Sequence, residues 1–183
     1  YVGRVAAVFA DDGTGERGDL YEVGLASGQT VNRTGTLAPL TFGNAGLALA
    51  ESWGVAATSD RLLRFDRGAA GSAEEVSFGP GGAPAWFAGE LALSPSGLFA
   101  ITVAGSAPTL ADAWVIGPTG DARRASQTAA HISVAGFLPE ALHGPYLAVS
   151  DDGARAAWRT EGATREAFMA IVPPPATPPA VAS

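Results

Sequence analysis

The sequence predicts an all-β fold built from repeated four-stranded antiparallel sheets. Short runs of apolar, β-branched or aromatic residues alternate with turn clusters rich in glycine, proline, serine and aspartate. The same order of strand and turn recurs along the chain, and its equivalent glycines, Gly3, Gly54, Gly97 and Gly153, are 51, 43 and 56 residues apart. Periods of about 40–50 residues with about four strands per unit are typical of the blades of a β-propeller.

The clearest repeat runs from Glu90 to Arg124. Large apolar residues alternate at its start, as in a strand with one buried face. Pro95-Ser96-Gly97 then favours a reversal, because proline presets φ and glycine accepts positive φ. A second turn cluster spans Gly117 to Asp121. We expect the four strands at 91–94, 98–103, 113–116 and 122–127.

Three further units are predicted by the same pattern. Residues 5–9, 20–23 and 29–34 match the second, third and fourth strands of a repeat, and residues 47–78 match a complete one. Residues 146–171 match three strands without a clear fourth. The predicted domain is 1–172, with blades at about 1–36, 37–79, 85–128 and 129–172. Residues 173–183 are proline-rich and are expected to form a tail or linker.

These repeats resemble the WD40-like, TolB-type (PD40-like) β-propeller repeat. Ser94-Pro95-Ser96-Gly97 and Ser150-Asp151-Asp152-Gly153 match its first turn, and Asp19-Leu20-Tyr21-Glu22-Val23 and Asp112-Ala113-Trp114-Val115-Ile116 match its third strand. The second blade departs from the pattern, with Glu51-Ser52-Trp53-Gly54 at the turn. The resemblance implies propeller architecture and says little about function, since propellers host many activities.

The number of blades leaves two architectures open. One is a closed four-bladed ring, and the other is a partial arc of a larger propeller whose free edges are covered by other segments or a partner. The chain opens at Tyr1 in the middle of a blade, which we interpret as a processed or truncated start or as part of a longer polypeptide.

Composition narrows the range of partners. The net charge of −7 argues against nucleic acid and anionic membrane surfaces. Only 16% of residues are charged, against about 25% in typical domains, which suggests surface covered by protein partners or further blades. There are no cysteines, and no apolar run approaches the roughly 18 residues of a membrane span.

One acidic loop is a candidate calcium site. Asp11, Asp12 and Glu16 supply oxygen ligands around a glycine turn, although their spacing does not fit an EF-hand, and a solvated acidic turn is the alternative. The same loop contains G-x-G-x-x-G at 13–18. A dinucleotide fingerprint needs a following helix, and a strand is expected here instead, so a hairpin loop is favoured.

The remaining catalytic patterns are sparse. His131 and His143 lie 12 residues apart, and two imidazoles alone rarely make a catalytic metal site, which usually has three protein ligands. A carboxylate such as Glu140 would supply a third ligand, and ordinary loop and strand roles are the favoured alternative. No G-x-S-x-G nucleophile elbow is present. We therefore expect no catalytic residue and no cofactor other than the calcium candidate.

Aromatic residues are the candidate partner contacts. Trp53 is expected in a turn, and Trp86-Phe87 follow a Gly/Pro loop, where exposed aromatics often bind partners. Packing between blades is the alternative for all three residues.

The sequence thus favours a non-enzymatic scaffold or protein-interaction subunit, periplasmic or extracellular, within a larger assembly. The alternative is a propeller enzyme, a hydrolase or lyase acting on a sugar or lactone in a central cavity. Acidic or histidine side chains with raised pKa values at that cavity would favour the enzyme. A third interpretation is a fragment of a larger receptor or sensor.

Overall fold

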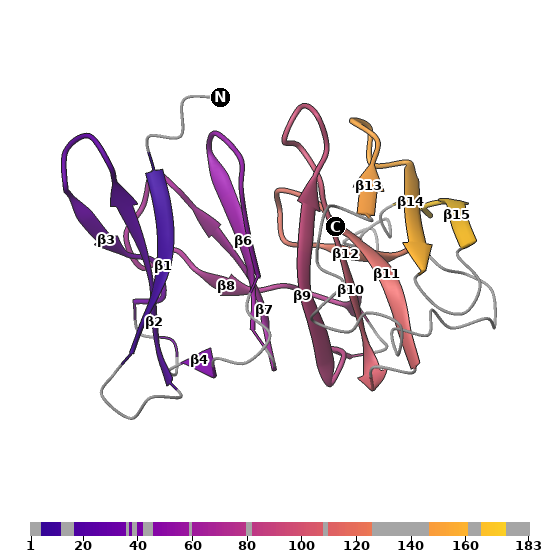
Figure 1. The fold of residues 1–183 in the computed structure, drawn as a ribbon, viewed down its shortest axis with the longest axis horizontal. Coiled ribbons are helices and arrows are strands. Elements are labelled where there is room, and N and C mark those ends of the chain that lie inside the picture. Colours follow the sequence, from indigo (N-terminus) through magenta and orange to yellow (C-terminus); the bar gives the residue numbers. More distant parts are fainter. Residues whose placement is uncertain are drawn as a thin grey trace, which may run out of the picture.

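The fold consists of β-strands arranged in four consecutive antiparallel sheets. The computed structural model describes residues 5–11, 17–35, 37, 40–41, 46–58, 60–79, 82–107, 110–125, 147–160 and 166–174. Some side chains within these ranges are not described, among them those of β1 and of Trp86. We call the sheets the first to fourth blades, in chain order (Figure 1).

The first and fourth blades are built around three-stranded meanders, and the middle two have four strands in sequence order. In the first blade, a short further strand, β4, pairs with the start of β2. Its strands are β1 (Val5–Asp11), β2 (Arg17–Gly24), β3 (Thr30–Asn32) and β4 (Leu40–Thr41). The second blade consists of β5 (Gly46–Leu49), β6 (Trp53–Ala57), β7 (Leu62–Asp66) and β8 (Glu74–Glu75). The third consists of β9 (Trp86–Leu93), β10 (Ala100–Ala107), β11 (Leu110–Ile116) and β12 (Ala122–Arg124). The fourth consists of β13 (Leu147–Val149), β14 (Arg155–Thr160) and β15 (Glu166–Ile171).

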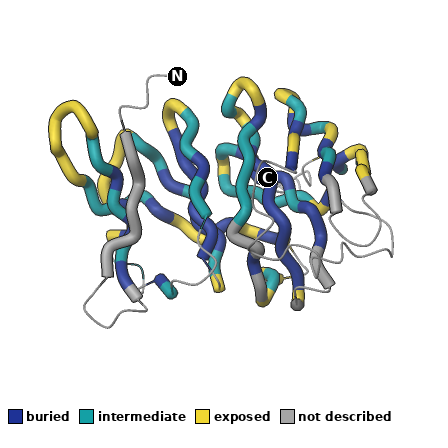
Figure 2. Tube along the Cα trace, in the orientation of Figure 1, coloured by how far each residue is buried: buried dark blue, intermediate teal, exposed yellow. Residues whose placement is uncertain are grey.

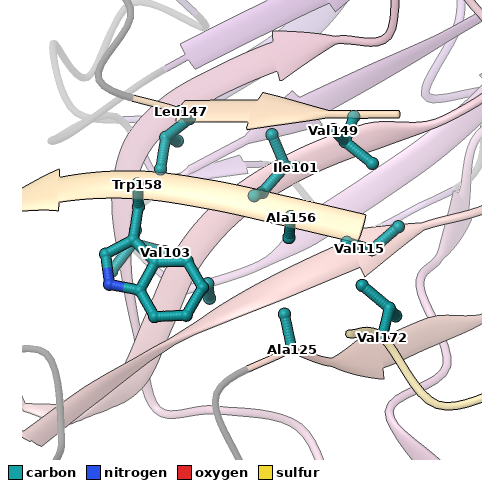
Figure 3. Close-up of a cluster of buried hydrophobic side chains, with 10 residues drawn as sticks. Ile101, Val103, Val115, Ala125, Leu147, Val149, Ala156, Trp158 and Val172 are labelled. Atoms are coloured by element: carbon teal, nitrogen blue, oxygen red, sulfur yellow. The ribbon is translucent and has the colours of Figure 1, made fainter. Parts of the chain in front are cut away.

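Each pair of neighbouring blades shares a hydrophobic cluster. The middle blades bury both faces, so adjacent residues enter different clusters: Leu63 packs toward the first blade and Leu62 toward the third. This two-sided burial explains why their central strands read as continuous apolar runs. The buried residues between the third and fourth blades are drawn in Figure 3 and comprise Ile101, Val103, Ala113, Val115, Ala125, Leu147, Val149, Ala156, Trp158 and Val172.

The blades follow one another across the molecule as an open arc. Figure 1 places the first and fourth blades at opposite ends. Among the described residues, no hydrophobic cluster joins these two blades. Of the two architectures left open by the sequence, the described strands therefore form the arc.

The turn after the first strand of a blade explains the serine–glycine repeat. Ser94 Oγ accepts a hydrogen bond from the amide of Phe99, and Ser150 Oγ accepts one from the amide of Arg155. Gly97 and Gly153 have φ values of 72° and 65°, which only glycine adopts without strain. These turns match the expected pattern.

The second blade differs at this turn, and two expectations there are wrong. Its hairpin is shorter, closed by the amide of Ala50 donating to the carbonyl of Trp53. Trp53 therefore begins β6 and does not lie in a turn. Gly54 lies within β6 without a positive φ, and a Cβ there would lie 2.3 Å from the Phe65 ring. Gly54 is thus required for packing and is not the equivalent of Gly97.

Candidate functional site

The outer end of the fourth blade carries the most exposed apolar side chains that the structure describes. Met169 and Ile171 on β15 are each 78% exposed. They pair with Ala157 and Arg155 of β14, whereas the alternate residues of β14, Ala156 and Trp158, pack into the third blade. Met169 and Ile171 therefore project from the face that points away from the rest of the arc, and Figure 2 shows much of β15 as exposed.

The same strand is also the edge of its sheet. The strand order is β13-β14-β15, so among the described residues β15 is paired only on the β14 side. Phe168, on its other face, stacks on Trp158 with ring centroids 5.8 Å apart. The position of β15 is thus fixed by the core, while its second edge has no partner strand among the described residues and Met169 and Ile171 are exposed on one face.

A buried ion-pair cluster joins the first and second blades. Both oxygens of Glu22 are used: Oε2 accepts from Arg33 Nε and Oε1 from Arg67 Nε, each at 2.9 Å. Arg33 also donates to the carbonyls of Ala69 and Arg67, and Arg67 Nη1 donates to the carbonyl of Ala50. Both oxygens of Glu22 are thus paired with arginines from two blades, so this cluster holds the first and second blades together.

An open cleft of about 560 Å³ lies beside this cluster. It is lined by Glu22, Glu51, Ser52, Asp66, Arg67, Gly68 and Ala69. Arg64 Nη2 contacts Asp66 Oδ1 at 2.5 Å, so this carboxylate is also paired. Across the described parts of the chain, no group of three or more His, Cys, Asp or Glu side chains is placed to hold a metal ion.

Glu90, on β9, is a partly buried carboxyl group. The pairing of β9 with β10 shifts register here: Leu91 pairs with Thr102 and Phe87 with Ala104, which leaves residues 88–90 opposite Val103. Such a bulge redirects a side chain. The Thr102 hydroxyl holds it by donating to the Glu90 carbonyl at 2.7 Å.

The environment of the Glu90 carboxyl disfavours its charge. Its Oε2 is shielded from solvent and has no hydrogen-bond partner among the described residues. Burial raises the pKa of this carboxyl above its usual value of 4.5, because desolvation disfavours the ionised form. Its partial burial therefore favours the protonated form of Glu90.

The acids of the fourth blade's turn have structural roles. Asp151 Oδ1 accepts from the amide of Ser96 at 2.6 Å and so binds the third blade, while Asp152 Oδ1 accepts from the amide of Ala154 at 2.9 Å. Hydrogen bonds from Ser96 and Ser150 lower the pKa of Asp151 and Asp152, respectively. Both contacts lie in the turn that the sequence predicted at Ser150–Gly153.

The predicted aromatic contacts are mostly buried. Trp53 is 3% exposed and Phe87 is 1% exposed, and both belong to the cluster between the second and third blades. Both residues were predicted as partner contacts because they were expected to be exposed. That expectation is wrong, because both rings pack between the second and third blades. Trp86 begins β9, and its side chain is outside the described set.

The other predicted ligands fall outside the described side chains. Asp11 ends β1, but its side chain is not described, and neither are Asp12 and Glu16. The same holds for His131, His143 and Glu140. Strand β2 begins at Arg17, within the G-x-G-x-x-G pattern, and continues to Gly24, so a strand follows the pattern as expected from the sequence.

Comparison with solved structures agrees with this arrangement of blades. TolB from Acinetobacter baumannii superimposes with a TM-score of 0.53 at 13% identity, over 93% of this chain and 41% of that chain. The fold is that of a TolB-type β-propeller. This confirms the propeller architecture that the repeats predicted. The chain spans about two fifths of the length of that TolB.

Two further solved structures align with lower TM-scores. A puromycin hydrolase aligns with a TM-score of 0.45 at 18% identity, over 79% of this chain and 22% of its own. A protein assigned to TolB from Agrobacterium tumefaciens aligns with a TM-score of 0.39 at 11% identity, over 78% and 62%. No family model and no curated protein matches the chain.

No helix in the described part of the structure is long and apolar enough to cross a membrane.

Three features were not found by sequence reasoning. Glu22, Arg33 and Arg67 come from different strands and turns, and their pairing depends on how blades pack. The bulge at Glu90 had a local signal in Ala88-Gly89, since glycine inside a strand often marks a bulge. The exposure of Met169 and Ile171 also had a sequence signal, because residues 146–171 match only three strands of the repeat.

Proposed function

We propose that this chain is a non-enzymatic scaffold or protein-interaction subunit built on a TolB-type propeller arc. Its partners are other protein segments that cover the outer end of the fourth blade. Consistent with the resemblance to TolB-type repeats, we place this subunit in the periplasm or outside the cell.

The observation that carries this proposal is the uncovered apolar face of the fourth blade. At each of the three junctions within the arc, a blade face is covered by its neighbour and its large side chains are buried. Met169 and Ile171 occupy the corresponding outward face of the fourth blade and are exposed. Exposed apolar surface next to a sheet edge favours association with another polypeptide.

Site-specific crosslinking tests the proposal in the protein as purified from its native source. A photoreactive amino acid is placed at position 169, and the matched control carries it at position 98, where Leu98 is 52% exposed in a turn. We expect a complex heavier than the chain by light scattering, with crosslinks to the partner from position 169 and few from position 98. A lone monomer without crosslinks would contradict a scaffold role.

A second candidate function, a hydrolase or lyase acting on a sugar or lactone, rests on Glu90, which does not line the described cleft. A partly buried carboxyl group with a raised pKa is the kind of group that serves as a general acid. The test is turnover of a panel of glycosides and lactones by the wild-type chain and by Glu90→Gln across pH. Turnover that Glu90→Gln abolishes without loss of folding supports the enzyme, and absence of turnover rejects it.

A further inference from the structure

The edge of β15 differs from the equivalent edges in the other blades. In the first three blades the third strand of the repeat pairs with a short outer strand: β2 with β3, β7 with β8, and β11 with β12. These outer strands pair over only two or three residues, as Tyr21–Val23 do with Thr30–Asn32. In the described part of the fourth blade, β15 holds the place of the third strand and no outer strand follows it.

The chain that leaves β15 is directed elsewhere. Val172 is buried between the third and fourth blades, and its amide donates to the carbonyl of Ala154 at 2.8 Å. The carbonyl of Pro173 accepts from Arg123 Nη1 of the third blade at 3.1 Å. The burial of Val172 and the contact of Pro173 with Arg123 place the chain against the third blade, whereas in the other blades a turn leads back along the sheet.

The sequence after β15 is also unsuited to a paired strand. Five of the residues 173–183 are proline. Proline lacks the N–H that a ladder needs. The prolines directly after β15, at 173–175, therefore cannot donate the hydrogen bonds of an outer strand there.

We propose that β15 is a strand-addition site, at which an extended segment of a partner protein pairs antiparallel with residues 167–171 as the missing outer strand. Backbone groups along the free edge supply the hydrogen bonds, as in other cases of β-augmentation. The inference rests on the proposed function and specifies how the partner binds.

The side chains of β15 define the chemistry of that segment. Met169 and Ile171 lie on one face, so apolar partner residues at alternate positions extend the same apolar surface. Phe168 and Ala170 lie on the other face, where they pack against the cluster shared with the third blade. The partner segment is thus short, extended and free of proline, with apolar residues two apart.

The test uses a synthetic peptide in which valine and threonine alternate between terminal lysines. Its matched control is the same peptide with alternate amides N-methylated, which keeps the side chains and removes backbone donors. Both are titrated into the isotope-labelled chain, and amide hydrogen exchange is followed by NMR. Peptide binding should slow exchange at alternate residues of β15, because their outward amides become paired. Methylation should weaken binding by about tenfold or more, from the loss of two or more backbone hydrogen bonds.

Two protein variants complete the experiment. Met169→Glu with Ile171→Glu should weaken binding of the unmethylated peptide, while Leu98→Glu should leave it unchanged. Equal binding of both peptides, or no slowing of exchange on β15, overturns strand addition. If crosslinking from position 169 still captures a partner in that case, the scaffold function stands and the partner docks on the face alone.

Discussion

The indole Nε1 of Trp53, at the start of β6, donates a 2.8 Å hydrogen bond to the carbonyl of Gly97 in the first turn of the third blade. On the other side, the same turn is bound by Asp151 of the fourth blade through the amide of Ser96. One turn is therefore held by both neighbouring blades. The turn thus links the second, third and fourth blades.

Replacing Trp53 by phenylalanine tests the contribution of this bond. Trp53→Phe keeps an aromatic ring in the cluster between the blades and removes the donor, so we expect a loss of about 1 kcal/mol in the free energy of unfolding. Urea unfolding measures the loss. The control is Trp114→Phe, whose indole donates to Ala104 within its own blade. Amide exchange around Gly97 should become faster in Trp53→Phe and not in Trp114→Phe. Equally fast exchange in both variants would contradict a link between blades through Trp53.

Gly153 permits a close approach between the third and fourth blades. It has a φ of 65°, and a Cβ there would lie 2.6 Å from the Phe99 ring. Gly28 has a φ of 69°, and a Cβ added there would have nothing within 4 Å, so it is a matched control for backbone strain alone. We expect Gly28→Ala to cost about 1–2 kcal/mol, and Gly153→Ala to cost about 1–3 kcal/mol more through overpacking.

A double substitution checks that Phe99 causes the difference. Gly153→Ala combined with Phe99→Leu should lose less stability than the sum of the single losses, because the smaller side chain relieves the clash. Thermal or urea unfolding of the four proteins gives the coupling. Additive losses would show that Phe99 is not the obstacle.

The sequence was informative where local chemistry sets the structure. The turns at Ser94–Gly97 and Ser150–Gly153 were predicted because the serine hydroxyl and the positive φ of glycine act within a few residues. The same reasoning was wrong at Gly54, which has the right residue type at a similar spacing. There the requirement for glycine comes from the distant Phe65 ring, which no local pattern reveals.

The candidate site was less predictable because it depends on contacts between blades. Trp53 and Phe87 follow turn-like segments and were expected to be exposed, but a neighbouring blade covers them. Met169 and Ile171 read as ordinary strand residues, and they are exposed because no described blade lies beyond them. Burial in a repeat fold depends on whether a neighbour is present, which a single repeat does not encode.

The Glu22 cluster should be sensitive to loss of one charge. Glu22→Gln leaves Arg33 and Arg67 partly buried without their anion, so we expect a loss of about 3–5 kcal/mol in the free energy of unfolding. The control is Glu75→Gln, because Glu75 is 3.7 Å from Arg61 on the surface and 62% exposed at its side chain. That substitution should cost less than about 1 kcal/mol. Similar losses for the two variants would mean that Glu22 has no special role in joining the blades.

Glu90 should make stability fall as pH rises. Its pKa is raised in the folded chain, so between the unfolded value near 4.5 and the folded value the native state holds more protons than the unfolded state. Stability therefore falls as pH rises through this window, and the full penalty applies above the folded pKa. Glu90→Gln keeps the shape without the charge, so it should be more stable than wild type at pH 7 and nearly equal to it near pH 4.

Asp151 should contribute to stability with the opposite pH dependence to Glu90. The hydrogen bond from Ser96 lowers the pKa of Asp151, so its contribution is present above the unfolded pKa and is lost as pH falls through the folded pKa. Urea unfolding at a series of pH values should therefore show Asp151→Asn below wild type at pH 7, where Glu90→Gln lies above it. If Glu90→Gln were less stable than wild type at pH 7, the ionised Glu90 carboxylate would have a stabilising partner in the folded protein. The case for Glu90 as a proton-holding group would then fail.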